Sequence, residues 1–361
     1  MPGKATARRS LVRRARPPAV LGFATAANVA GWPGYVGPME WRQLDQLSVD
    51  ERVGILSLLR RVEAADDAPA LPEPELLALQ SATPSGGRAL LCFASGAHQG
   101  DGTDSASTDA ASTDSASTDA VGDVVGAAFL FPDRQGSTVT YLALDPTVRT
   151  EETGTELLEE ALSRVGPGGS VSLWAMAADE HDDRRAQALG FMTVRELLQM
   201  RVTLPIRAEV ADGTRPLTTR PFEPKRDEAA WVETNNRAFA GHPEQGAWTV
   251  DQLTSRMAAD WVDLEGFLVA DDGSGLLGSC WTKIHHAHQP VLGEIYVIAV
   301  DPAHHGQGWG RSLTVAGLEF LAGRGVEVGM LYVDAANLAA VGLYRSLGFT
   351  VHHVDRCYRR A

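Results

Sequence analysis

The stretch that decides the fold is Val300-Asp-Pro-Ala-His-His-Gly-Gln-Gly-Trp-Gly-Arg311. An apolar strand ends in Asp-Pro, and a loop with three alternating glycines then leads into a helix. Glycine lets the backbone approach a ligand closely, and the N–H groups at the start of a helix form an anion site that suits a pyrophosphate. The stretch lacks the Gly-Lys-Ser/Thr of a Walker A loop and the later acidic residue of a Rossmann fingerprint. It therefore predicts a phosphate site of another kind.

The same pattern occurs twice in the chain. Tyr141-Leu-Ala-Leu-Asp-Pro146 corresponds to Tyr296-Val-Ile-Ala-Val-Asp-Pro302, and Ala188-Leu-Gly-Phe191 corresponds to Ser346-Leu-Gly-Phe349. In both halves an apolar strand ends in Asp-Pro, a helix and a second apolar strand follow, and a short helix ends on Leu-Gly-Phe. Self-similarity of this kind reveals the unit of architecture. We expect an α/β protein with a mixed sheet, built from two tandem copies of one domain.

The composition along the chain gives the expected domain limits. We predict a disordered extension over residues 1–38, an N-terminal domain over 39–205, a linker over 206–217 and a C-terminal domain over 218–361. Residues 97–123 repeat Ser-Thr-Asp-Ala units and contain almost nothing that could be buried, so we expect a disordered insert at the turn between two strands. Arginines before the mildly apolar stretch near the N-terminus resemble a signal peptide only superficially, and Met39 is an alternative start.

Charge and cysteine content restrict the possible partners. The chain has 361 residues and a formal net charge of -14, which would repel nucleic acid and anionic membranes. No apolar run approaches the ~18 residues that cross a bilayer. Its three cysteines, Cys92, Cys280 and Cys357, form no C-x-x-C pair, so we expect reduced thiols and no metal site. These features predict a cytoplasmic protein that acts on a small molecule, and we expect it to be a monomer.

The glycine loop, the segment Asn337-Leu-Ala-Ala-Val-Gly-Leu-Tyr344 and Leu347-Gly-Phe349 together resemble the GNAT acetyltransferase superfamily over residues 218–361. The family loop pattern is Gln/Arg-x-x-Gly-x-Gly/Ala, and His305 departs from it at the first position. The resemblance implies acetyl-CoA as the acetyl donor, with the strand before the loop pairing with its pantetheine arm. The implied acetyl-CoA contacts are Ile298, Ala299, Val300, His305, Gly306, Gln307, Gly308, Trp309, Gly310, Arg311, Asn337, Leu338, Ala339, Ala340, Val341 and Gly342.

Glu294 and Tyr344 are the acid/base candidates. The attacking nitrogen must be neutral, yet an amine with a pKa near ~8 is mostly protonated at neutral pH, so a carboxylate that accepts its proton helps. The leaving thiolate needs a proton, and a tyrosine with a pKa near ~10 retains one to give. The alternatives are an ordinary strand residue for Glu294 and a core aromatic residue for Tyr344.

The N-terminal copy lacks these groups. Alignment on the Asp-Pro and Leu-Gly-Phe anchors places Thr138 opposite Glu294, Glu152 opposite Gly308, and Ala186 opposite Tyr344. We therefore expect a degenerate, catalytically silent N-terminal domain that forms one wall of the substrate cleft. It retains a strand that could still bind an acyl-CoA through Leu142, Ala143 and Leu144.

Residues 235–248, Trp281-Thr-Lys283 and Gly293-Glu-Ile-Tyr296 resemble the mycothiol synthase family, tandem GNAT enzymes of actinobacteria. That family acetylates the cysteinyl amine of desacetyl-mycothiol, an amino-sugar-inositol, in the last step of mycothiol biosynthesis. The resemblance implies substrate contacts from Glu244, Lys283, Glu294 and Tyr332, and a contact to the inositol end from Glu73. A shift of register to Glu75 is an alternative, as is a solvated surface role for Lys283.

Two other functions stay open at this point. The first is a GNAT enzyme for another amine, such as an aminoglycoside or a protein N-terminus. The second is a non-catalytic module that senses acyl-CoA. The presence of Glu294 together with Tyr344 in the second copy, and the absence of both in the first, argues against a silent second domain.

The acid/base hypothesis predicts that Glu294→Gln lowers turnover by roughly 10²-fold or more, because the amide cannot accept the amine proton. Binding of acetyl-CoA should be nearly unchanged. Steady-state kinetics and a titration with acetyl-CoA measure the two effects separately. Undiminished turnover would remove Glu294 from the mechanism.

Overall fold

The structure of the protein is a computed structural model, which describes residues 39–44, 47–80, 88–94, 124–133, 136–165, 169–211, 213–241, 246–271, 273 and 275–360. All of these belong to one compact unit, Val36–Ala361. The predicted extension 1–38 and insert 97–123 lie outside the described residues. No helix in the described ranges combines the length and the apolar character that a membrane span requires.

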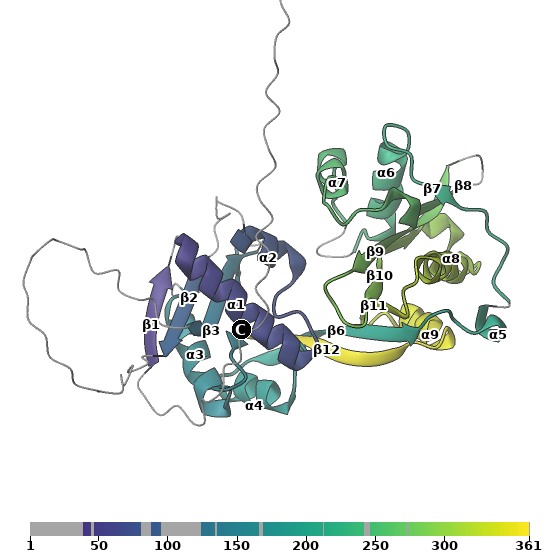
Figure 1. The fold of residues 1–361 in the computed structure, drawn as a ribbon. Helices are drawn as coiled ribbons and strands as arrows, with labels where there is room; N and C mark the ends of the chain where they lie inside the picture. Colours follow the sequence, from purple (N-terminus) through teal and green to yellow (C-terminus); the bar gives the residue numbers. More distant parts are fainter. Residues whose placement is uncertain are drawn as a thin grey trace, which may run out of the picture. The chain divides into compact units, whose positions relative to one another are not determined.

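The elements follow one another as the repeat predicted (Figure 1). The first half contains β1 (Met39–Leu44), α1 (Val49–Asp66), α2 (Glu73–Gln80), β2 (Arg88–Ala94), β3 (Val124–Pro132), β4 (Thr138–Leu144), α3 (Glu151–Ser163), β5 (Val171–Ala175), α4 (Glu180–Ala188), β6 (Met192–Thr203) and α5 (Ala208–Ala211). The second contains β7 (Arg220–Pro221), α6 (Glu228–Ala238), α7 (Val250–Met257), β8 (Phe267–Asp271), β9 (Leu276–His285), β10 (Leu292–Val300), α8 (Trp309–Gly323), β11 (Val328–Asp334), α9 (Leu338–Ser346) and β12 (Thr350–Arg360).

The described strands form one 12-stranded mixed sheet in the order β1-β2-β3-β4-β5-β12-β6-β11-β10-β9-β8-β7. Parallel pairing occurs between β4 and β5 and between β10 and β11, whereas the other neighbours are antiparallel. The mixed α/β class is as predicted, and β2 pairs with β3 as expected for the strands on either side of the insert.

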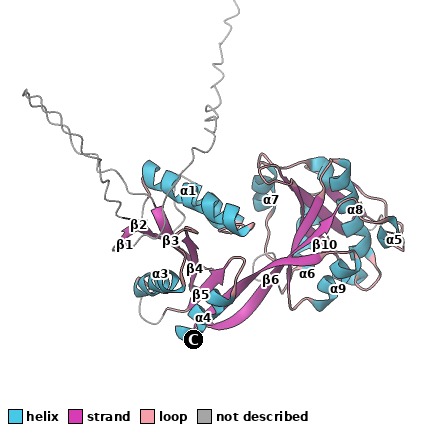
Figure 2. Ribbon diagram, turned by 60° about the horizontal axis from the view of Figure 1, so that its bottom comes forward, coloured by secondary structure: helices cyan, strands magenta, loops and turns pink. Residues whose placement is uncertain are grey.

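The two halves exchange their last strands. β6, which ends the first half, pairs with β11 of the second half from Thr203 to Leu197. β12, which ends the second half, pairs with β5 of the first half from Arg356 to Arg360. The exchanged strands also pair with each other and lie side by side in Figure 1, and Figure 2 shows the long strand β6 from another direction. The domain limits expected at 205 and 218 stay a prediction, but the sheet runs without a break across them.

Side chains on the exchanged strands complete the cores. Met200 on β6 is fully buried in the apolar cluster that contains Leu313 and Leu318 of α8. Tyr358 on β12 is 1% exposed and packs with Phe191 and other apolar residues of the first half. Each half therefore completes its core with a strand from the other half, which ties folding of one half to folding of the other.

Helix α8 covers the sheet on β9 and β10 and positions the glycine loop. Leu313, Leu318 and Leu321 recur at helical spacing and are fully buried, as expected for the core-facing stripe of a helix. A Cβ atom at Gly317 would lie 2.5 Å from Cys280 Sγ, so a glycine at this position allows close packing. The middle of α8 thereby packs closely against β9.

The exchange of strands predicts an effect on stability. Met200→Ala should lower the free energy of unfolding by about 2–5 kcal/mol, because it removes a fully buried side chain. Val194→Ala, on the same strand but at a position that is 50% exposed, is the matched control and should change it by no more than about 0.5 kcal/mol. Denaturant unfolding followed by circular dichroism measures both. Equal effects would show that β6 does not complete the second core.

Candidate functional site

Strands β10 and β11 separate at Glu294. Their parallel pairing covers only Leu292, Gly293 and Glu294 of β10, whereas β9 follows β10 as far as Val300, with a β-bulge between Ile295 and Val297. From Ile295 onward, no strand of the described part of the chain pairs with the other edge of β10. Such an edge can hydrogen-bond an extended ligand as an additional strand. The predicted contacts Ile298, Ala299 and Val300 lie on this edge.

The loop after β10 has the backbone geometry of an anion site. Gly306 and Gly308 have φ values of 74° and 88°, a region that residues with a Cβ rarely adopt. Gly308 is the N-cap of α8 and provides no side-chain cap. The backbone N–H groups of residues 306–310 have no backbone acceptor recorded within the described residues. Residues 306–310 are all predicted acetyl-CoA contacts, and their backbone N–H groups are available to phosphate oxygens.

Several predicted acetyl-CoA contacts already have partners within the protein. His305 Nε2 lies 3.0 Å from the Val300 carbonyl oxygen. Arg311 donates to Ser346 Oγ at 2.7 Å and to the Val210 carbonyl oxygen at 2.5 Å. The ring of Trp309 lies under the guanidinium of Arg215, 3.8 Å from the ring centroid. These side chains shape the loop, so any ligand contact from them must share or replace these interactions.

The α9 segment contributes in different ways. Asn337 is the N-cap of α9 and accepts the Ala340 N–H. Leu338 is 77% exposed, whereas Val341 is buried in the core. The exposed positions Leu338 and Ala339 can face a ligand, but the Val341 side chain packs inward, so only its backbone could serve as the predicted contact.

The first half has the strand separation but not the open helix start. β4 pairs with β5 only from Thr138 to Tyr141, which leaves Leu142, Ala143 and Leu144 without a partner on that edge among the described strands. α3, however, begins with a capping box in which the Thr150 side chain accepts the Thr153 N–H. The alignment of Glu152 with Gly308 was wrong, because the loop is two residues shorter in the first half and the N-cap is Thr150.

Glu294 lies at the point of separation and is 8% exposed. His285 Nε2, at the end of β9, lies 2.8 Å from Glu294 Oε2. A carboxylate can only accept, so Nε2 carries the proton of this hydrogen bond. The carboxylate therefore has one oxygen held by His285, and its second oxygen can receive a proton from an amine.

Tyr344 on α9 belongs to the core of the second half, with 6% exposure and its ring 5.8 Å from that of Phe349. Burial raises the pKa of the Tyr344 phenol, and the nearby Cys280 thiol raises it further. The phenol thus keeps its proton throughout the neutral pH range, as a proton donor must. Its burial in the core fits the alternative of a core aromatic residue, and its raised pKa is compatible with the predicted role as a proton donor.

The predicted contacts Glu73 and Lys283 are 210 positions apart in the sequence but form a direct hydrogen bond. Lys283 Nζ lies 2.6 Å from Glu73 Oε1, and Arg256 of α7 lies 3.0 Å from Glu73 Oε2. The Lys283 ammonium also lies 4.7 Å from the ring centroid of Trp261. Only 11% of the Lys283 side chain is exposed, which argues against a solvated surface role.

The choice between Glu73 and Glu75 can be made from their neighbours. Glu75 accepts a hydrogen bond from the Tyr141 hydroxyl within the first half, whereas Glu73 reaches residues of the second half. This arrangement favours Glu73. Glu244, the other predicted carboxylate, lies outside the described residues.

Tyr332 lies on β11, two residues beyond Met330, which is the partner of Glu294. It accepts a hydrogen bond of 2.8 Å from Gln199 of β6. Burial raises the pKa of Tyr332, with the charges of Asp355 and Glu294 adding to the rise. The residue therefore presents a neutral hydroxyl on the sheet face that carries Glu294.

His353 and Asp355 on β12 extend this polar face. Burial raises the pKa of Asp355 to about 6 and lowers that of His353 to about 4, so the ring is neutral at neutral pH. Its 3.4 Å approach to Asp355 is then not a salt bridge. Asp355 Oδ2 and both His353 nitrogens have no hydrogen-bond partner among the described residues. Burying polar atoms without hydrogen bonds costs free energy of folding. Packing alone therefore does not explain why polar residues occupy this region.

Two residues of the site were missed by the sequence interpretation. His285 and Arg256 carry no motif, and each is identified only by its partner, Glu294 or Glu73. The alternation along β9 was the available signal, because it places His285 on the same face as Lys283.

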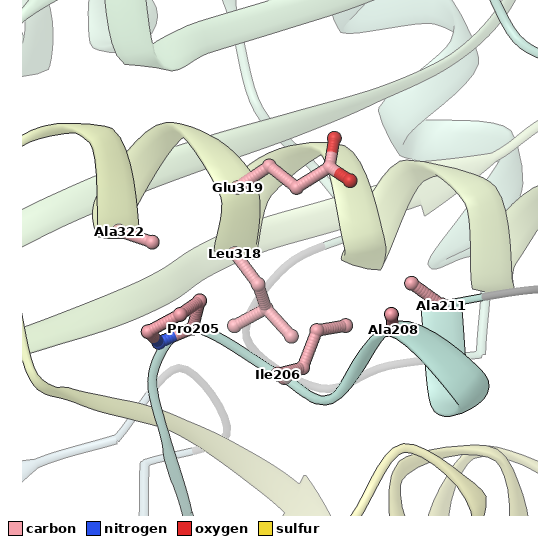
Figure 3. A pocket seen from close by; sticks show the side chains of 7 residues that line it. All are labelled: Pro205, Ile206, Ala208, Ala211, Leu318, Glu319 and Ala322. Atoms are coloured by element: carbon pink, nitrogen blue, oxygen red, sulfur yellow. The ribbon is translucent and has the colours of Figure 1, made fainter.

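An apolar pocket of about 420 Å³ lies elsewhere, where the segment after β6 crosses α8 (Figure 3). Leu318 points toward Ile206, and Glu319 extends away from it. The lining residues are Pro205, Ile206, Ala208, Ala211, Leu318, Glu319 and Ala322. It contains none of the predicted site residues, so we locate the site at the separation of β10 and β11.

Comparison with known sequences points to one family. Residues 229–349 match the Acetyltransferase (GNAT) family. The chain is 40% identical over 316 residues to the mycothiol acetyltransferase of Thermobispora bispora, covering 86% of this chain and 96% of that protein. It is 36% identical over 329 residues to the mycothiol acetyltransferase of Geodermatophilus obscurus, covering 89% and 97%.

Solved structures share the fold. A GCN5-related N-acetyltransferase from Sphaerobacter thermophilus has a TM-score of 0.61 at 21% identity, covering 89% of this chain and 95% of that one. A tandem GNAT protein from the clavulanic acid biosynthesis pathway has a TM-score of 0.60 at 18% identity, covering 89% and 98%. These similarities confirm the predicted tandem GNAT fold.

The loop geometry predicts that Gly308→Ala weakens acetyl-CoA binding by about tenfold. Alanine disfavours the positive φ of this position, and a change of φ would turn the N–H groups at the start of α8 away from the phosphate oxygens. Gly325→Ala is the matched control. Gly325 follows the other end of α8, has a φ of 79°, and, like Gly308, has nothing within 4 Å of an added Cβ. Both variants should lose about 1 kcal/mol of stability. Calorimetric titration with acetyl-CoA separates them, and equal affinities would contradict the assignment.

Proposed function

The chain belongs to the mycothiol acetyltransferase family of GNAT enzymes, and from this we propose that it transfers the acetyl group of acetyl-CoA to the cysteinyl amine of desacetyl-mycothiol. This is the last step of mycothiol biosynthesis. The observation that carries the site assignment is the position of Glu294, the last residue of β10 to pair with β11. The proposal includes a cytoplasmic monomer that needs no metal.

The residues of β10 and the glycine loop fit acetyl-CoA. The free edge from Ile295 to Val300 is long enough to hydrogen-bond an extended pantetheine arm. The N–H groups around Gly308 suit the pyrophosphate at the far end of that arm. An arm that runs along this edge from the loop has its thioester near Glu294. Acetyl-CoA supplies an activated acetyl group in this position.

The chemistry requires the nitrogen to lose two protons and the sulfur to gain one. Glu294 takes a proton from the cysteinyl ammonium and leaves a neutral nitrogen, which can attack the thioester carbonyl carbon. Tyr344 gives its phenolic proton to the coenzyme sulfur as the carbon–sulfur bond breaks. The nitrogen, positively charged after its attack, gives up its second proton, which replaces the one that Tyr344 lost. The products are the amide and the free thiol, and the proton on Glu294 is released to solvent.

The charged pairs around Glu73 support recognition of a sugar rich in hydroxyl groups. Glu73 can accept from hydroxyl donors, while Lys283 and Arg256 can donate to hydroxyl oxygens. Because these three groups pair with one another, they are positioned before a ligand arrives. Tyr332 adds a neutral hydroxyl beside Glu294. We propose that Glu73, Glu244, Lys283 and Tyr332 bind the substrate, as the family resemblance implied.

A coenzyme A release assay with the purified protein tests this function. The amines are desacetyl-mycothiol, a panel of aminoglycosides, and peptides with free N-termini, each with acetyl-CoA. We expect kcat/KM for desacetyl-mycothiol to exceed that for any other amine by at least about 10²-fold, since unpaired polar groups penalise a substrate that lacks the matching hydroxyls. Turnover of another amine alone would overturn the substrate assignment. Acetyl-CoA binding with no turnover of any amine would favour the sensor alternative.

A further inference from the structure

The carboxylate of Glu294 has one hydrogen-bond partner among the described side chains, and that partner is His285. The side chains are 11% and 20% exposed, respectively. An isolated buried carboxylate is poorly solvated and free to rotate, whereas one that accepts a hydrogen bond is both stabilised and oriented. His285 therefore fixes which oxygen of Glu294 faces the reacting amine.

The nearby Lys283 ammonium does not take the place of His285 as the hydrogen-bond donor to Glu294. Lys283 is the direct cross-strand partner of Glu294, yet its ammonium lies 2.6 Å from Glu73 instead. His285 is paired with Leu292 and lies diagonally across from Glu294 on the same sheet face, within reach of a side chain of this length. A lysine on Glu294 would hold the carboxylate in its charged form as an ion pair and weaken it as a base. The His285 N–H orients the carboxylate through a single hydrogen bond instead.

Other ionisable groups surround the hydrogen bond between His285 and Glu294. The ring of His288 lies 5.8 Å away. Burial, followed by the proximity of His285, lowers the pKa of His288, so His288 is neutral at neutral pH. Tyr296 and Tyr332 face Glu294 with protonated phenols. The charged groups near His288 are Asp67, the C-cap of α1, and Arg201 of β6, which pair with each other at 2.8 Å.

We infer that His285 is a positioning residue of the acetyl transfer: its Nε2–H holds one oxygen of Glu294 so that the other oxygen accepts the proton of the substrate amine. The inference rests on the proposed function. It predicts a loss in kcat and no loss in acetyl-CoA binding, because His285 acts only through the carboxylate.

His285→Phe, which keeps the ring size but removes the donor, should lower kcat about tenfold to a hundredfold, with KM for acetyl-CoA unchanged. His285→Gln places an amide N–H near the same position and should restore kcat to within about threefold. His286→Phe is the matched control, because His286 is the exposed neighbour on the same turn, and it should behave like the wild type. If the Phe variant melts below the assay temperature, His285→Ala provides the same comparison without added bulk.

A double-variant cycle with Glu294→Gln shows whether His285 acts through Glu294. In the Glu294→Gln background, His285→Phe should change the remaining turnover by less than about twofold. A full loss of kcat in that background, or wild-type kcat in His285→Phe alone, would overturn the inference.

A readout that needs no turnover separates this inference from the proposed function. Nitrogen NMR of the imidazole rings at neutral pH should show His285 protonated at Nε2, and the signal should shift in Glu294→Gln. Protonation at Nδ1 alone would overturn the positioning role even if the enzyme is active. Absence of turnover with desacetyl-mycothiol in the wild type would overturn the proposed function and leave the NMR result to decide the hydrogen bond.

Discussion

The pairing of β6 with β12 is the constraint on which the rest of the structure depends. Each strand ends one half of the chain, pairs with the other half, and carries side chains such as Met200 and Tyr358 into the other half's core. Backbone hydrogen bonds along a sheet fix the register of their neighbours to a single residue. The contact between Glu73 at the start of α2 and Lys283 on β9 can therefore be direct and short, because the two halves that carry them share one continuous sheet.

Much of the second half could be predicted because its signals are local. An apolar strand, β11, follows α8 as the repeat predicted, and α8 begins at Trp309, within the glycine-containing stretch that predicted a helix start. The exchange of β6 and β12 could not be predicted, because both strands follow the same Leu-Gly-Phe signal. A repeated sequence pattern makes the two possible pairings equivalent until side-chain packing distinguishes them.

The site was predictable only in part for a similar reason. Glu294 and the glycines lie within motifs, whereas His285 and Arg256 are defined by what they touch. The error at Glu152 shows the limit of counting from an anchor. Asp145 and Asp301 correspond, but the first loop reaches its N-cap at Thr150 while the second reaches it at Gly308. The length of a loop depends on whether it binds a ligand or caps a helix, so the two copies of a repeat can differ in loop length.

The corresponding helices α3 and α8 use their N-terminal ends in two different ways. Thr150 and Thr153 satisfy each other's backbone N–H groups, an arrangement that stabilises a helix by about 1 kcal/mol. Gly308 gives up that cap and holds a φ of 88°, so the N–H groups of α8 remain open to an anion. A helix end can be capped by its own chain or kept free for phosphate, but not both. The first half has the stable arrangement and the second the open one, and the acid/base pair Glu294 and Tyr344 occurs only where the helix end is open.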